Sequence, residues 1–154
     1  GCYPSSDASR SAQIIPALRL VSRLSLVKEI PAGWTVSYGR TFTAKEKMRI
    51  GAVAAGYADG LSRKLSNVGK MMVRGRVVPI LGRVCMDLTM VDLAGVPEAR
   101  AGDEVIVYSD RREDPNSVEN TAKLTGTIPN EVLCALTARV QRVHVPAEEG
   151  ELST

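Results

Sequence analysis

The sequence has few of the residues from which a self-contained catalytic site is usually built. Its one histidine, His144, lies in an alternating run near the carboxyl end, where a structural or surface role is expected. Its cysteines, Cys2, Cys85 and Cys134, are odd in number and widely spaced, which suits neither a disulfide framework nor a zinc site. The glycines are dispersed and form no phosphate-binding or dinucleotide-binding fingerprint. The residues alone therefore predict no metal site and no cofactor site.

Long hydrophobic runs and blocks of one charge are also missing. No apolar run approaches the ~20 residues needed to cross a bilayer, and no signal-peptide pattern opens the chain. The 20 Lys and Arg residues exceed the 17 Asp and Glu residues, but they are scattered among the acids. We therefore expect neither a membrane nor a nucleic acid as a partner, and a cytoplasmic protein with reduced thiols.

The length and composition are those of one ordinary globular domain. The chain has 154 residues, of which 44% are apolar and 24% are charged, so a single core can form. Its first residue is Gly rather than Met, and this opening favours a fragment or a processed product. We expect residues 1–16 to be a lead-in loop and the acidic residues 147–154 to be a frayed tail.

Hydrophobic periodicity predicts several short strands. In residues 18–27, alternation places Leu18, Leu20, Leu24 and Leu26 on one buried face. A turn at 31–33 then predicts a hairpin with a β-rich run at 35–41. Further strands are expected at 48–55, on both sides of Gly75, at 84–93, at 104–108 and at 139–145.

Other residues predict the positions of breaks and helices. Pro79 favours an edge strand or a bulge, and alternation in 84–93 makes Met86 a core residue. Asn116 or Ser117 can cap a short helix that ends at Gly126, and a second helix is expected to begin at Pro129. The residues alone predict a soluble, β-rich domain.

Four short motifs carry a more specific signal because they occur in a fixed order. They are VSYG at 36–39, GYADG at 56–60 with Arg63, PILGRVCMD at 79–87, and NEVLC at 130–134 followed by Arg139. Together they resemble the carboxy-terminal domain of the pyridoxal-phosphate-dependent alanine racemases, and the resemblance covers nearly the whole chain. It implies a mainly β fold over residues 1–154, an antiparallel barrel or sandwich-like domain with one or two short helices near the C-terminus.

The resemblance implies that Tyr38 is one of two proton carriers. Racemisation needs one carrier on each face of the substrate, and the family uses a barrel lysine and a tyrosine from the partner subunit's carboxy-terminal domain. Pyridoxal phosphate supplies the electron-withdrawing ring that makes the α-proton removable. That cofactor belongs to an amino-terminal barrel to which nothing in these 154 residues corresponds. The isolated chain is therefore expected to be inactive, with no cofactor-binding residue of its own.

The remaining implied roles concern the substrate. Met86 resembles a residue whose backbone amide meets the substrate carboxylate, and Asp87 beside it resembles a pocket residue, with a solvated strand carboxylate as the alternative. Tyr57, Arg63 and Arg83 resemble the lining of a substrate entryway, where cations attract an anionic carboxylate. Surface salt bridges are the alternative for both arginines.

One residue departs from the family pattern. Ala138 stands where some family members have a tyrosine that contacts the cofactor phosphate. Arg40, near Tyr38 along the chain, is a further candidate cation if the strand is regular.

The sequence therefore predicts the carboxy-terminal domain of an alanine racemase that interconverts L- and D-alanine for the bacterial cell wall. The expected partner is the amino-terminal barrel of a second subunit in a homodimer. Two alternatives stay open: a stand-alone β-rich binding or assembly module, and a racemase domain for another amino acid such as serine.

Overall fold

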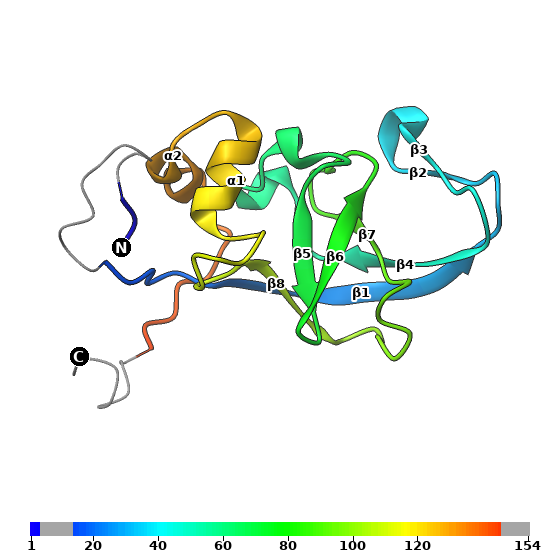
Figure 1. The fold of residues 1–154 in the computed structure, drawn as a ribbon, viewed down its shortest axis with the longest axis horizontal. Helices are drawn as coiled ribbons and strands as arrows, with labels where there is room; N and C mark the ends of the chain where they lie inside the picture. Colours follow the sequence, from blue (N-terminus) through cyan, green and yellow to red (C-terminus); the bar gives the residue numbers. More distant parts are fainter. Residues whose placement is uncertain (4–13, 146–154) are drawn as a thin grey trace.

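Six antiparallel strands close into a barrel in the computed structural model, which describes residues 1–3 and 14–145 (Figure 1). The strands follow one another around the barrel as β1 (Leu20–Ile30), β4 (Met48–Val53), β7 (Thr89–Asp92), β6 (Arg76–Leu81), β5 (Lys70–Val73) and β8 (Glu104–Tyr108). A mainly β antiparallel barrel is therefore confirmed. The interpretations made for residues 4–13 and 146–154 lie outside the described residues.

The longest strand, β1, closes the barrel because it pairs with a different neighbour along each half. Its first half pairs with β8, from Leu20 opposite Tyr108 to Arg23 opposite Glu104, and its second half pairs with β4. The β4 register shifts between Leu24 and Leu26. This irregularity changes the face on which Leu26 lies, so Leu26 is exposed and its predicted burial was wrong.

The hairpin predicted around Gly75 is confirmed, and Pro79 lies, as predicted, where its strand is paired on one side only. Strands β5 and β6 are joined at Arg74 and Gly75, which both have positive φ (50° and 74°), as a tight hairpin turn requires. Strand β6 pairs with β5 from Arg76 to Pro79, whereas its pairing with β7 covers only Ile80 and Leu81. The Ile80 amide faces β5 and donates to the Gly69 carbonyl, so the nitrogen of the preceding Pro79 faces the β7 side. Proline is tolerated because pairing with β7 begins only at Ile80, and no hydrogen bond from residue 79 is needed there.

The hairpin predicted between 18–27 and 35–41 is also wrong. Strand β2 (Thr35–Val36) pairs instead with β3 (Phe42–Thr43) in a separate two-stranded sheet beside the barrel (Figure 1). The run between them leaves the β conformation and forms the 3-10 turn η1 (Tyr38–Arg40). This arm covers a small second core made of Ile30, Val36, Ala44, Ile50 and Leu81.

Two short helices pack beside one another near the end of the chain, as predicted. Helix α1 (Val118–Thr125) is capped by Ser117, whose hydroxyl accepts from the Asn120 amide, and it ends at the left-handed Gly126. Helix α2 (Pro129–Cys134) has proline in its first turn. The strand expected at 139–145 is absent, and these residues form a turn followed by irregular backbone.

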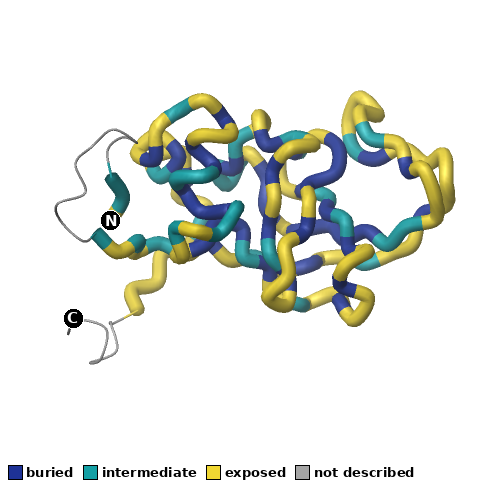
Figure 2. The backbone as a smooth tube through the Cα atoms, in the orientation of Figure 1, coloured by how far each residue is buried: buried dark blue, intermediate teal, exposed yellow. Residues whose placement is uncertain are grey.

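The main core fills the barrel interior and continues under the two helices. Figure 2 shows the buried backbone concentrated along the barrel strands. Completely buried members include Val53, Met71, Val73, Val91 and Val105. No helix among residues 1–3 and 14–145 is long and apolar enough to span a membrane.

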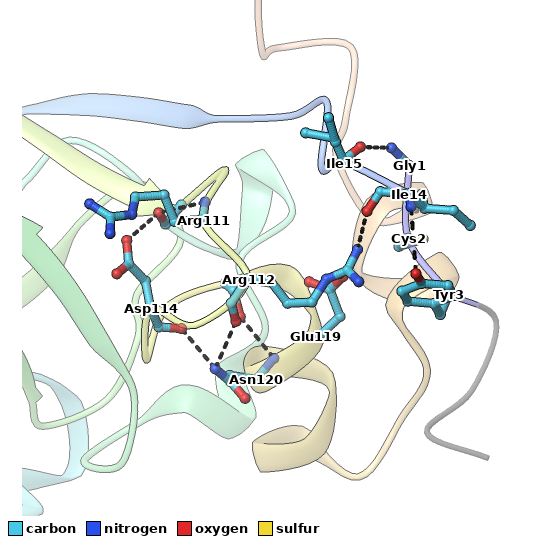
Figure 3. A network of polar contacts seen from close by, with 12 residues as sticks. Gly1, Cys2, Tyr3, Ile14, Ile15, Arg111, Arg112, Asp114, Glu119 and Asn120 are labelled. Carbon is cyan, nitrogen blue, oxygen red and sulfur yellow. Dashed lines mark hydrogen bonds and ion pairs between the residues drawn. The ribbon is translucent and has the colours of Figure 1, made fainter. Parts of the chain in front are cut away.

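Arg112 fastens the amino-terminal residues to this body (Figure 3). Its guanidinium donates to the Ile14 carbonyl at 2.9 Å, pairs with Glu119 at 3.1 Å and lies 4.4 Å from the centre of the Tyr3 ring. Because Glu119 belongs to α1, the start of the chain lies against the helical end of the domain.

Candidate functional site

The four sequence motifs meet in space, although they are up to about a hundred residues apart along the chain. The irregular loop 82–88, between β6 and β7, lies at the centre of this arrangement, which we call the motif cluster. Most of the contacts described below join that loop to another motif or join two of the other motifs.

Residues 56–60 dock on the loop through the backbone. The amides of Tyr57 and Ala58 donate to the carbonyls of Cys85 and Met86 at 2.9 and 3.0 Å. Gly56 permits this approach, because a side chain at that position would collide with both of those carbonyls. The 3-10 turn η2 (Tyr57–Asp59) is thereby held against the loop.

Residues 36–39 dock on the opposite end of the loop. The Ser37 hydroxyl donates to the Arg83 carbonyl at 2.5 Å and lies 3.2 Å from the Cys85 sulfur. Asn67 strengthens this junction, since its side chain accepts from the Gly82 amide at 2.7 Å and donates to the Thr41 hydroxyl at 3.1 Å.

Arg139 joins the last motif to two of the others, and no role was predicted for it. Its guanidinium contacts Asp87 at 2.7 Å and Asp59 at 3.3 Å. The hydrogen bond to Asp87, together with the charges of both carboxylates, raises the pKa of Arg139 above its ordinary value. The sequence offered one signal for this role, since Arg139 follows the NEVLC motif at 130–134, but both of its acid partners lie far away along the chain.

Tyr38 projects from the motif cluster into solvent, with 73% of its surface exposed. It lies on the 3-10 turn η1, so the β-rich run predicted at 35–41 is interrupted at this residue. The strand-face relation between Tyr38 and Arg40 is wrong for the same reason: Ser37, Gly39 and Arg40 have φ values of 66°, 71° and 49°.

Met86 is also exposed, at 51%, which contradicts its predicted place in the core. Alternation failed because regular pairing begins only at Thr89. Among the described residues, none accepts a hydrogen bond from the Met86 amide, so this donor is available to a ligand. Asp87 likewise lies on no strand and is held by Arg139.

Tyr57 and Arg63 lie together at the edge of the motif cluster. The Arg63 guanidinium sits 5.9 Å from the centre of the Tyr57 ring, and both residues line a cavity of about 290 Å³. Arg83 lies on the other side, against Gly39. Within the described part of the chain, neither arginine has a carboxylate within salt-bridge distance, so the surface salt bridges considered for them are not formed there.

The residues of the motif cluster do not fit pyridoxal phosphate by themselves. None of the four motifs contains a lysine that could carry the cofactor. Ala138, which stands where some family members have a phosphate-contacting tyrosine, has only a methyl side chain. Within residues 1–3 and 14–145, no three His, Cys, Asp or Glu side chains are grouped as metal ligands, and all three cysteines are free thiols. Burial raises the pKa of Tyr108, which argues against that tyrosine as a proton carrier at neutral pH.

Comparison with known proteins identifies the domain. The family model described as alanine racemase, C-terminal domain, matches residues 17–144. Alanine racemase 2 of Caldanaerobacter subterraneus is 41% identical over 145 residues, which are 94% of this chain and 37% of that protein. The chain thus spans little more than a third of the length of this relative.

Two solved structures show the same arrangement. The alanine racemase of Clostridium difficile 630 in complex with cycloserine superposes with a TM-score of 0.83 at 38% identity, covering 91% of this chain and 36% of the other. The Bartonella henselae enzyme with covalently bound pyridoxal phosphate has a TM-score of 0.77 at 29% identity, covering 82% and 34%. The chain belongs to the alanine racemase family and corresponds to its carboxy-terminal domain.

Proposed function

We propose that this chain completes the active site of an alanine racemase by adding Tyr38 and a substrate-binding wall to the pyridoxal-phosphate barrel of a partner subunit. The observation that carries the proposal is the exposure of Tyr38 beside the loop that contains Met86. Its hydroxyl forms no hydrogen bond with the described residues. An exposed phenol on a turn that is hydrogen-bonded to the loop 82–88 is suited to meet a substrate supplied from outside the domain.

Each motif residue has a defined part in this proposal. The cofactor makes the α-proton of the substrate removable, and Tyr38 exchanges that proton on one face while a barrel lysine serves the other. The free Met86 amide donates to the substrate carboxylate, next to Asp87. Arg63 and Arg83, which lack acid partners in the described structure, attract the anionic substrate past Tyr57.

The proposed substrates are L- and D-alanine, which the complete cytoplasmic homodimer interconverts to supply D-alanine for peptidoglycan. The chain alone is inactive in this proposal because the second proton carrier and the cofactor site are contributed by the barrel. Serine is the competing substrate, and a stand-alone binding module is the competing role.

A chimeric enzyme tests the proposal. This chain replaces the matching domain of the Caldanaerobacter racemase, and alanine racemisation is followed by circular dichroism. We expect an active chimera in which Tyr38→Phe lowers kcat by about 10²–10⁴-fold, the range typical of one general acid–base group.

Tyr3→Phe is the matched control, because Tyr3 lies against Arg112 and outside the motif cluster. An active chimera whose turnover is insensitive to Tyr38→Phe would falsify the role of Tyr38. An inactive chimera that is folded and cofactor-loaded would favour the binding-module alternative. A higher kcat/KM for serine than for alanine would identify serine as the preferred substrate.

A further inference from the structure

The backbone of Ser37, immediately before Tyr38, has a conformation that residues other than glycine rarely adopt. Its φ is 66° and its ψ is 179°, a region that is populated almost entirely by glycine. A serine persists there only where its surroundings hold it in place. Such outliers concentrate at functional sites, so the contacts of Ser37 are informative.

Two neighbours hold Ser37 in this conformation. Its hydroxyl donates to the Arg83 carbonyl at 2.5 Å, with the Cys85 sulfur 3.2 Å away. Gly82 admits the serine, since a Cβ built on Gly82 would lie 2.8 Å from the Ser37 Cβ and 2.7 Å from the Val36 carbonyl oxygen. Gly82 itself has a φ of 70°, so two uncommon conformations face each other across the junction.

The unusual backbone conformation of Ser37 determines where the Tyr38 side chain lies. On a regular strand, residues two apart lie on the same face, so Tyr38 would follow Val36 toward the second core. Val36 is only 5% exposed and packs in that core, whereas Tyr38 is 73% exposed. The turn of the backbone at Ser37 therefore directs the tyrosine away from the apolar cluster under the arm.

We propose that Ser37, seated on Gly82, is a positioning residue that keeps the Tyr38 phenol outside the core and at a fixed place beside the loop 82–88. The catalytic consequence rests on the function proposed above. The structural consequence does not, because the place of Tyr38 can be measured in this chain without a barrel or a cofactor.

Fluorine NMR of the chain labelled with 3-fluorotyrosine measures that place. The sequence has four tyrosines, so the Tyr38 resonance is identified by its loss in Tyr38→Phe. A soluble gadolinium chelate should broaden it strongly in the native chain and leave buried Tyr108, which is 1% exposed, almost unaffected. In Ser37→Ala the hydrogen bond to the Arg83 carbonyl is lost, so nothing holds the backbone at this φ. We therefore expect Tyr38 to turn toward the second core and its broadening to fall toward that of Tyr108.

Ser37→Gly is a second test of whether Ser37 positions Tyr38, for use if Ser37→Ala folds poorly. Glycine accepts the native φ but has no hydroxyl, so Tyr38 should sample both positions and show intermediate broadening. Ser25→Ala is the matched control, since it removes a serine hydroxyl that donates to the Ala52 carbonyl at 3.0 Å on regular β1. Native broadening of Tyr38 in both Ser37 variants overturns the proposal.

The active chimera adds a functional readout. Ser37→Ala should lower kcat by about 10²-fold with little change in KM, because misplacing a reacting group penalises the chemical step more than binding. If Tyr38 moves and kcat does not, the positioning role in catalysis is overturned. If Ser37→Ala leaves both the resonance and kcat unchanged while Tyr38→Phe abolishes turnover, the proposed function stands and this inference alone fails.

Discussion

At the scale of single residues, Arg139 is the side chain that most directly connects the motifs. It contacts Asp87 on the loop that carries Met86, and it contacts Asp59, whose other carboxylate oxygen accepts from the Gly56 amide at 2.9 Å. The arginine is half exposed, so these pairs contribute little to global stability. Their effect is local, because they hold the loop that presents the Met86 amide.

Arg139→Gln should separate these two effects. We expect a change of less than about 1 kcal/mol in the free energy of unfolding, as is usual for exposed ion pairs. In the chimeric racemase, KM for alanine should rise by about tenfold, equivalent to about 1.4 kcal/mol of lost binding. Urea denaturation and steady-state kinetics measure the two quantities.

Arg19→Gln is the control for this experiment, since the Arg19–Glu104 pair has a similar length, 2.8 Å, and a similar exposure but contains no residue of the motif cluster. An equal rise of KM in both variants would show that Arg139 has no special relation to the substrate loop.

At the scale of elements, one ion pair ties the β5–β6 turn to the start of β8. Arg74 donates to both oxygens of Asp103 at 2.6 and 3.1 Å, and the Arg100 amide donates to the same carboxylate at 2.9 Å. The Arg74 hydrogen bond, followed by that of Arg100, lowers the pKa of Asp103 below its ordinary value of 3.8. This junction is where two segments about thirty residues apart are joined at the mouth of the barrel.

The lowered pKa predicts a pH-dependent contribution to stability. Because the folded chain holds the Asp103 carboxylate more tightly than the unfolded chain, its contribution is complete above pH 3.8 and is lost as pH falls through the folded-state pKa. Asp103→Asn should therefore lower the urea midpoint at pH 7, and the difference from wild type should shrink below pH 3.8. Asp110→Asn is the control, as Asp110 forms no salt bridge with the described residues. A difference that does not depend on pH would contradict the prediction.

At the scale of the whole molecule, the motif cluster leaves four large apolar or aromatic side chains in solvent. Tyr38, Tyr57, Met86 and Leu88 are 73%, 41%, 51% and 42% exposed. Aromatic residues and methionine are enriched where proteins meet. This surface therefore suits contact with the proposed barrel better than permanent exposure to water.

Hydrogen exchange should detect that contact. The Met86 amide has no acceptor in the described structure, so it should exchange rapidly in the isolated chain. When the racemase barrel domain is added, exchange should slow in residues 37–41, 56–59 and 83–88, as measured by mass spectrometry. The β5–β6 turn at Arg74 and Gly75 should exchange at the same rate with and without the barrel. Equal protection everywhere, or none, would contradict the proposed docking surface.

Local chemistry was sufficient wherever a segment's structure depends on its own residues. The cap at Ser117, the helix end at Gly126 and the tight turn at Gly75 are all formed as predicted, because each needs only a side-chain oxygen or a positive φ at one position. The four motifs likewise identified the residues that gather in the cluster. Strand alternation failed at Leu26 and Met86, where a register shift and an irregular loop interrupt the pairing.

By itself, the sequence determined the β-rich character through its local periodicity, and its four motifs carried the resemblance to the family and supplied most residues of the motif cluster. Only the tertiary structure decided that Arg139 bridges Asp59 and Asp87 and that Tyr38 points outward. Those features depend on contacts between segments tens of residues apart: an ion pair across two loops, and a serine hydroxyl bonded to a carbonyl beyond Gly82. No period or propensity within one segment encodes such contacts, because they exist only after the barrel has closed.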